Sequence, residues 1–150
     1  MKITLLPMAL LALCISCKND AKDTNQLAIQ GTWKLISGMT IEKGDTILTD
    51  YTQKQEFIKL INATHFSFLR HDLTKGKGKD AVFSAGGGTY TLQGNKYSEF
   101  LQYCNYREWE NNHFDFTLKL ENDTLTQEGR EKIDSLGVDR LNVEKYIRVK

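Results

Sequence analysis

The sequence predicts an all-β fold: an up-and-down antiparallel β-barrel of about eight to ten strands, with one short helix before the last strand. Three observations lead to this prediction. Short segments of alternating hydrophobicity recur along the chain, tight turns rather than long crossovers connect them, and three consecutive glycines interrupt one segment. A two-layer sandwich would also fit consecutive hairpins, but a bent meander favours closure into a barrel.

The strands are expected where apolar and polar residues alternate between turn signals. They cover residues 31–37, 55–61, 65–71, 81–92, 96–103, 113–121, 124–129 and 142–150, and residues 40–48 form a hairpin around Lys43, Gly44 and Asp45. Turns at residues 62–64, 93–95 and 122–123 join neighbouring strands, whereas the lysine-rich residues 73–80 predict a mobile connection.

Two segments depart from regular alternation. Residues 130–137 have helical character, because Ile133 and Leu136 are three residues apart and Gly137 is placed to end a helix. Within residues 81–92, three glycines in mid-strand cannot pack side chains, so they predict a β-bulge or a sharp bend. These glycines are Gly86, Gly87 and Gly88.

The first sixteen residues predict a secretory signal peptide. Lys2 supplies a positive start, residues 3–15 are almost wholly apolar, and the small residue Ser16 precedes Cys17. A helix over residues 3–15 would be only about 20 Å long, less than the ~30 Å hydrocarbon core of a bilayer. The segment is therefore expected to be removed on export rather than to span a membrane.

Residues 13–17, with the sequence LCISC, resemble a bacterial lipobox, in which a small residue precedes the cysteine that becomes lipidated. The usual leucine lies one place earlier here, because Cys14 stands three residues before Cys17. The resemblance implies a signal peptide over residues 1–16, lipidation of Cys17 and a flexible polar tether within residues 17–30. An ordinary signal peptide that leaves Cys17 as a spare thiol is the alternative.

Composition indicates one globular domain over residues 31–150 and limits its partners. The chain has 20 basic and 19 acidic residues, and the loss of Lys2 would leave the exported domain neutral. Nucleic acid is therefore not an expected partner, because it is bound through an excess of Lys and Arg. Cys104 has no expected disulfide partner, so the core must stabilise the fold unaided. The expected location is the cell envelope, as an outer-membrane lipoprotein that faces the periplasm or the cell surface.

Trp33, two residues after Gly31, and Arg148 on the last strand resemble lipocalin-like, calycin-type barrels, in which this arginine packs across the first-strand tryptophan at the closed end. Residues 61–72, 84–92, 95–103 and 146–149 also resemble a group of small Gram-negative bacterial lipoproteins with lipocalin-like domains of unknown function. This second resemblance covers residues 31–150. It implies a fold and a structural role for Trp33 and Arg148, but no established chemistry.

A small barrel can hold one small molecule, and its inward residues alternate along each strand. Alternation along residues 96–103 puts Tyr97, Glu99 and Tyr103 on one face, which fits either a pocket wall or an ordinary packed core. On residues 65–71, Arg70 shares a face with two phenylalanines and would meet Glu99 or an anionic ligand group, unless it pairs at the surface. The expected ligand-binding residues are Arg70, Tyr90, Tyr97, Glu99, Tyr103 and Tyr106.

No metal or cofactor is expected. His65 and His71 are six residues apart on one strand, about 20 Å, so they cannot share an ion. No catalytic motif occurs either. The leading hypothesis is a membrane-anchored lipoprotein that binds a small hydrophobic or amphipathic ligand without catalysis. The alternatives are an enzyme that uses Glu99 with a tyrosine or His71, and a module that binds an envelope protein through the aromatic loop at residues 103–114.

Overall fold

The computed structural model describes residues 26–150. The predicted signal peptide, the lipidation site Cys17 and the first part of the tether lie outside the described residues. In the described part, no helix has the length and apolarity needed to cross a membrane.

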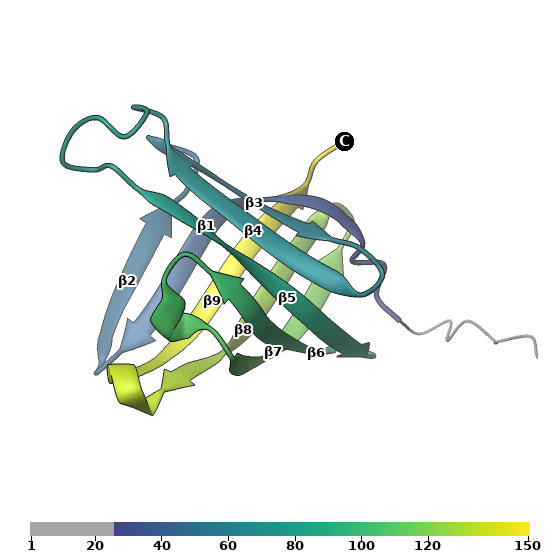
Figure 1. Ribbon diagram of the computed structural model, residues 1–150. Coiled ribbons are helices and arrows are strands. Elements are labelled where there is room, and N and C mark those ends of the chain that lie inside the picture. The colour runs from purple at the N-terminus through teal and green to yellow at the C-terminus, as the bar shows by residue number, and fades with distance from the viewer. Residues whose placement is uncertain (1–25) are drawn as a thin grey trace, which may run out of the picture.

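The described residues form one antiparallel sheet that closes on itself (Figure 1). Its strands are β1 (Gly31–Glu42), β2 (Asp45–Asp50), β3 (Gln55–Ile61), β4 (His65–Asp72), β5 (Phe83–Gln93), β6 (Lys96–Cys104), β7 (Asn112–Glu121), β8 (Thr124–Ile133) and β9 (Val138–Arg148). Two 3₁₀ turns, η1 (Arg107–Trp109) and η2 (Asp134–Leu136), interrupt the sheet connections. The predicted all-β antiparallel barrel is confirmed, and its architecture is consistent with a lipocalin-like fold.

Closure depends on β1, which pairs with three strands. Residues 31–34 pair with β3, residues 37–42 pair with β2, and β9 pairs with β1 from Trp33 to Glu42. Since β2 pairs with β1 alone among the described strands, the other eight strands form the closed barrel. Beyond Lys34, β2 replaces β3 beside β1, and β2 does not pair with β3. The wall is therefore not continuously hydrogen-bonded toward one end.

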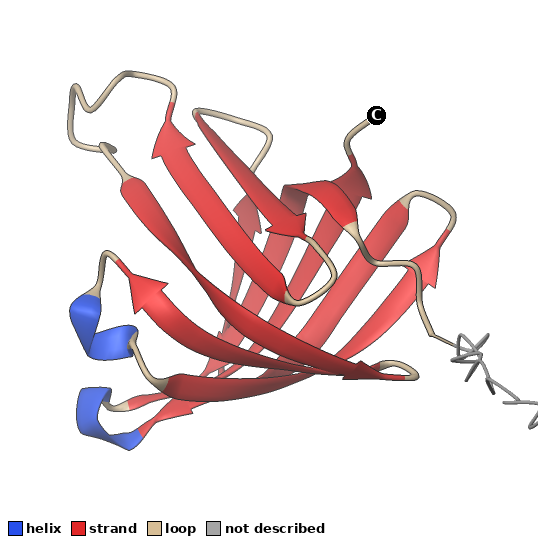
Figure 2. Cartoon of the chain, turned by 45° about the vertical axis from the view of Figure 1, so that its right-hand side comes forward, coloured by secondary structure: helices blue, strands red, loops and turns tan. Residues whose placement is uncertain are grey.

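The two ends of the barrel differ. Both 3₁₀ turns lie at one end, whereas the chain enters the described domain at the opposite end (Figure 2). At that second, closed end, Trp33 is fully buried and its Nε1 donates to the carbonyl of Ile29 at 2.7 Å. The Arg148 guanidinium lies 4.1 Å from the centroid of the Trp33 ring, the contact that the lipocalin resemblance implied. Its Nη atoms donate to the carbonyls of Gln30 and Ala28 at 2.8 and 2.7 Å.

The end of the predicted tether is part of this closed end. Ile29 is only 2% exposed and belongs to the hydrophobic core, and Leu27 packs against that core. The carbonyls of residues 28 and 30 accept the Arg148 hydrogen bonds described above. Residues 26–30 are therefore ordered by the barrel, so the packed domain starts before residue 31.

The helix predicted over residues 130–137 is wrong in most of its length. Strand β8 continues to Ile133, and only the single 3₁₀ turn η2 separates it from β9. Cross-strand ion pairs, Arg130 with Asp139 and Glu131 with Arg140, stabilise the extended pairing of β8 and β9. Gly137 does end the turn, with a left-handed φ of 64°.

The three glycines of β5 mark a close approach of backbones. The register between β5 and β6 shifts between Gly87 and Gly88, which is the predicted irregularity. A Cβ on Gly88 would overlap the carbonyl oxygen of Phe100, and one on Gly86 would overlap the ring of Phe68. Since no side chain fits there, the glycines allow β5 to bend over its neighbours.

Candidate functional site

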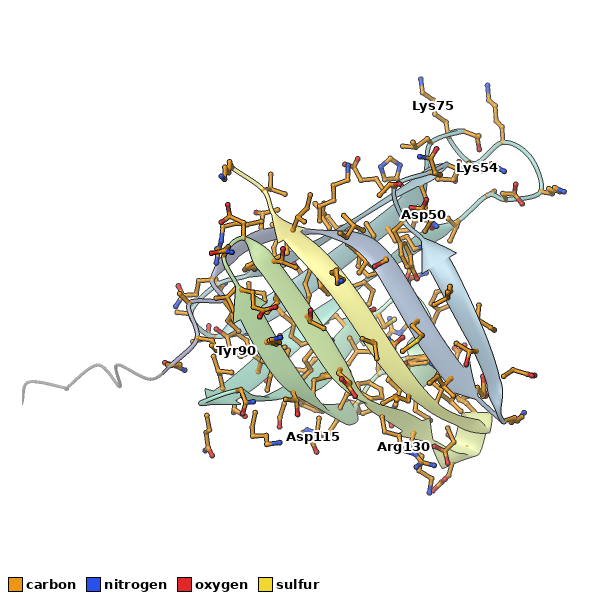
Figure 3. All side chains as sticks on the ribbon, turned by 180° about the vertical axis from the view of Figure 1, so that it is seen from behind. Asp50, Lys54, Lys75, Tyr90, Asp115 and Arg130 are labelled. Carbon is orange, nitrogen blue, oxygen red and sulfur yellow. The ribbon has the colours of Figure 1, made fainter. Side chains whose placement is uncertain are left out.

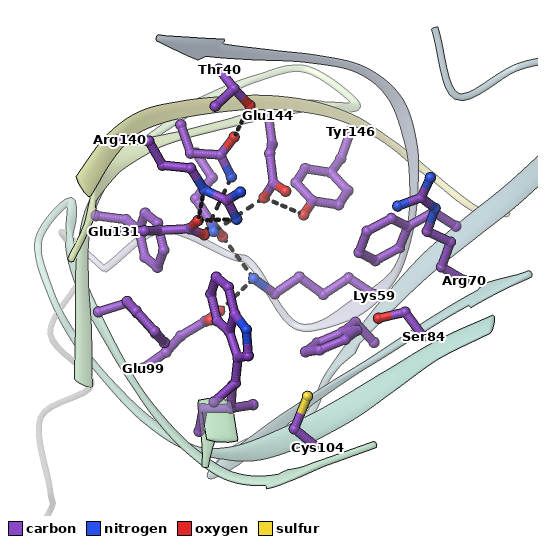
Figure 4. A pocket seen from close by; sticks show the side chains of 18 of the residues that line it. Thr40, Lys59, Arg70, Ser84, Glu99, Cys104, Glu131, Arg140, Glu144 and Tyr146 are labelled. Carbon is purple, nitrogen blue, oxygen red and sulfur yellow. Dashed lines mark hydrogen bonds and ion pairs between the residues drawn. The ribbon is translucent and has the colours of Figure 1, made fainter. Parts of the chain in front are cut away.

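A cavity of about 400 Å³ lies inside the barrel, and its lining includes Trp109 of η1. Figure 4 shows side chains that line it. Residues from every strand of the closed barrel, from the β2–β3 connection and from the β6–β7 connection line it. They are Thr40, Tyr51, Phe57, Lys59, Phe68, Arg70, Ser84, Glu99, Leu101, Cys104, Tyr106, Trp109, Phe114, Phe116, Gln127, Glu131, Arg140, Asn142, Glu144 and Tyr146.

Lys59 of β3 is the central charge at the inner end of the cavity. It is 3% exposed, and its ammonium group forms an ion pair with the carboxylate of Glu99 on β6. The same Nζ donates to Oε1 of Gln127 on β8 at 2.7 Å. It also lies 5.3 Å from the ring centroids of Phe66 and Tyr97, an arrangement that favours a cation. Buried charges persist when they are paired in this way.

Glu144 of β9 extends this polar cluster. The hydroxyl of Tyr146 donates to its Oε2 at 2.6 Å, and Nε2 of Gln127 donates to the same oxygen at 3.3 Å. Burial raises the pKa of the Glu144 carboxyl above its usual range; nearby Lys59 opposes this shift, and Glu131 adds to it. Burial thus makes the charged form of this carboxyl less favourable than it is in water.

A second ion pair lies nearer the end of the barrel that carries η1. Both Nε and Nη2 of Arg140 lie 2.7 Å from Oε2 of Glu131, and the guanidinium is 5.3 Å from the ring centroid of Trp109 in η1. Nδ2 of Asn142 donates to the other carboxylate oxygen at 3.3 Å, and Thr40 of β1 donates to Asn142 at 3.2 Å. These contacts connect β1, β8, β9 and η1 along one wall.

Arg70 of β4 stands on another wall, with Lys59 between it and the Glu131–Arg140 pair (Figure 4). Its Nε donates to Oε1 of Gln55 at 2.8 Å, and its guanidinium lies 5.4 Å from the ring centroid of Tyr51. Within residues 26–150, no carboxylate lies within ion-pair distance of it. Arg70 is therefore a half-buried cation whose partners are neutral.

Aromatic rings form the apolar part of the lining. Phe57 and Phe68 contact each other with ring centroids 5.9 Å apart, and Trp109 and Phe114 do so at 6.1 Å. Cys104 lies among the apolar residues, and burial raises the pKa of its thiol, so the unreactive neutral form is favoured. The cavity thus offers flat apolar surfaces and fixed polar groups to the same occupant.

The residues predicted from the sequence are distributed between several locations. Arg70, Glu99 and Tyr106 line the cavity. Tyr97 is 1% exposed, and its buried hydroxyl has no hydrogen-bond partner in the described part of the chain. Tyr90 lies near the closed end (Figure 3), where its hydroxyl donates to the carbonyl of residue 62 at 2.7 Å. Tyr103 is 68% exposed on the outer surface.

One expectation about a shared face is wrong. Tyr103 does not share the inward face of Glu99, because Gln102 is an extra residue at the β-bulge, between the partners of Gly87 and Gly88. The bulge reverses the alternation, so Cys104 points inward instead. For Arg70 the sequence left three partners open: Glu99, an anionic ligand group or a surface residue. The first pairing does not occur, since Lys59 occupies the Glu99 carboxylate.

Sequence reasoning missed four charged interior residues: Lys59, Glu131, Arg140 and Glu144. A signal existed for Lys59, because it alternates with Phe57 and Ile61, which places a lysine on an apolar face. Glu131 fell within the predicted helix, and strand β9 has polar residues on both faces. For Arg140 and Glu144, the alternation of apolar and polar residues therefore does not show which face of β9 points into the barrel.

The fold and the cavity define a class of protein: a closed eight-stranded antiparallel β-barrel with an internal cavity that is both aromatic and charged. No protein-family model and no curated protein matches this sequence. Within the described residues, no three His, Cys, Asp or Glu side chains are grouped so that they could hold a metal ion.

Proposed function

We propose that this protein is an exported, membrane-anchored lipoprotein whose barrel binds one small, partly apolar molecule and does not transform it. The observation that carries the proposal is the interior cavity of about 400 Å³ with aromatic and polar walls. Its volume falls in the ~300–1,000 Å³ range of small-molecule sites, which combine apolar walls with a few placed polar groups.

The state of the interior carboxyl groups supports binding rather than catalysis. Glu99 is held by Lys59, Glu131 by Arg140, and Glu144 accepts hydrogen bonds from Tyr146 and Gln127. A general base must be within hydrogen-bond reach of a substrate proton and free to accept it. Glu99 and Glu131, which are already paired with cations, are better suited to orient a ligand than to accept a proton.

The membrane anchor is proposed from residues 13–17, and the placement of the domain is compatible with it. The described chain starts at the closed end, whereas the cavity lies toward the end with the two 3₁₀ turns (Figure 2). An anchor attached upstream of residue 26 would therefore leave the cavity mouth on the side away from the attachment point.

Ligand binding is tested by native mass spectrometry of the protein purified from its own host. We expect a bound small molecule that is released on denaturation. Ser84→Phe places a ring in the cavity and should abolish this adduct, because Ser84 lines the cavity wall. Ser67→Phe on β4, a position that alternates with inward Phe66 and Phe68, is the matched outer-face control and should keep it. The same adduct on Ser84→Phe would place the molecule outside the cavity and contradict the proposal.

The anchor has a separate test. Cys17→Ser should move the protein from the membrane fraction to the soluble fraction of the cell envelope, because the acyl chains can no longer be attached. An unchanged distribution between the two fractions would contradict lipidation of Cys17 without affecting the ligand proposal.

A further inference from the structure

We propose that the ligand carries an anionic group and that Arg70 binds this group at the outer part of the cavity. The inference rests on the proposed ligand-binding function and specifies the chemical class of the ligand: an amphipathic anion with an aromatic or otherwise flat apolar body.

The charges inside the cavity support an anion. Of the three interior cations, Lys59 is paired with Glu99 and Arg140 with Glu131, so Arg70 has no carboxylate partner among the described residues. The remaining carboxyl group, Glu144, accepts hydrogen bonds from Tyr146 and Gln127 and is not within ion-pair distance of Arg70. The cavity therefore holds one cation, Arg70, that no described carboxylate contacts.

Arg70 also has unused hydrogen-bonding capacity. An arginine carries five N–H donors, and all except the one on Nε belong to its two Nη atoms. Only Nε is engaged among the described contacts, by Gln55, while Tyr51 contacts the guanidinium plane. The two Nη atoms match the paired oxygens of a carboxylate, sulfonate or phosphate group.

The strand register places an apolar surface directly below this cation. Arg70 is opposite Phe57 on β3 and Ser84 on β5, and Phe68 lies two residues deeper on its own strand, opposite Lys59. Two residues of a strand span about 7 Å. A molecule whose anionic group contacts Arg70 would thus lay its apolar body against Phe57 and Phe68 and reach toward the polar cluster around Lys59.

A cationic ligand fits this arrangement poorly. Its charge would have to replace Lys59 or Arg140 on a carboxylate that is already neutralised, and Arg70 would repel it. A neutral ligand would leave the half-buried guanidinium of Arg70 with fewer polar partners than it has in water.

The test uses two fluorescent probes with one shared apolar body, anilinonaphthalene sulfonate and its neutral parent phenylnaphthylamine. Each is titrated into the wild-type protein, Arg70→Gln and Lys145→Gln. The last variant removes one positive charge from an exposed position and leaves the cavity unchanged. We expect wild type to bind the sulfonate at least about tenfold more tightly than the neutral probe, as for hydrogen bonds to a charged group.

Arg70→Gln should weaken binding of the sulfonate probe by about tenfold and change the affinity for the neutral probe by less than about twofold. Lys145→Gln should change neither affinity. Equal affinities of wild type for both probes, or unchanged sulfonate binding by Arg70→Gln, would overturn the role of Arg70 but leave the ligand-binding function standing. If neither probe binds in the cavity, both proposals fail for this class of molecule.

A second measurement does not depend on the folding of the Arg70 variant. In wild type, sulfonate affinity should fall as salt is raised from low to high concentration, whereas affinity for the neutral probe should not fall. Salt-independent sulfonate binding would overturn the inference. Inorganic sulfate alone should displace the sulfonate probe only weakly, since sulfate lacks the apolar body. Complete displacement at micromolar sulfate would show a site for a free anion and would also overturn the inference.

Discussion

Replacing Lys59 with methionine would leave the Glu99 carboxylate buried without its cation. Methionine keeps an unbranched side chain between the surrounding aromatic rings, so the change removes the charge more than the volume. The side chains of Lys59 and Glu99 are 4% and 9% exposed, which means that water replaces the lost partner poorly. We expect the free energy of unfolding to fall by about 3–5 kcal/mol, the cost of leaving one member of a buried ion pair unpaired.

The double variant Lys59→Met/Glu99→Met separates charge from packing. With both charges removed, replacement of a buried ion pair by apolar residues of similar volume is often neutral or stabilising. Gln127 then loses its donor from Lys59 but keeps its contact with Glu144. The double variant should therefore recover more than half of the loss seen in the single variant, and the double-mutant cycle gives the coupling energy.

The assay is equilibrium urea unfolding at pH 7, followed by the fluorescence of Trp33 and Trp109. Equal losses in the single and double variants would refute the reasoning. That result would mean that the cost comes from packing and not from an uncompensated charge.

Three further changes test other parts of the structure. Arg148→Lys keeps the charge but loses the planar contact with Trp33 and one carbonyl hydrogen bond. Thermal unfolding should show a free energy of unfolding lower by about 1–2 kcal/mol, and a decrease below about 0.5 kcal/mol would contradict this role of Arg148. Gly88→Ala would overlap the Phe100 carbonyl and should cost about 2–3 kcal/mol in urea unfolding, and an unchanged midpoint would contradict the close approach. Burial raises the pKa of Glu144 in the folded state, so the folded protein binds this proton more tightly than the unfolded chain does. The resulting stabilisation of the folded state is complete below the pKa that Glu144 has in the unfolded chain, and it is lost as the pH rises through the pKa of the folded state. Glu144→Gln should therefore gain stability relative to wild type across that interval, by up to about 1.4 kcal/mol per pH unit, and a difference constant with pH would contradict the shift.

The sequence by itself determined the strands and most of their connections. Alternating hydrophobicity located the strands, and the turn after Lys43 was predicted because glycine readily supplies the positive φ that a tight hairpin requires. In the structure Gly44 has a φ of 89°, and Lys43 also adopts a positive φ, 52°. The run of glycines in β5 predicted an irregularity there, and the register with β6 does shift beside it, although the extra residue, Gln102, belongs to β6. Local conformational preference carries this information, and it acts over a few residues.

Tertiary structure decided which side chains meet inside the barrel. Lys59 is 40 residues from Glu99 and 68 from Gln127, and closure of the sheet brings them together. The one-residue bulge at Gln102 then moved Tyr103 outside and Cys104 inside, which no unbroken alternation could predict. Alternation shows which residues share a face of a strand, but partners across the barrel depend on the register of every strand between them. The sequence therefore determined the barrel, and only its closure determined the charged interior.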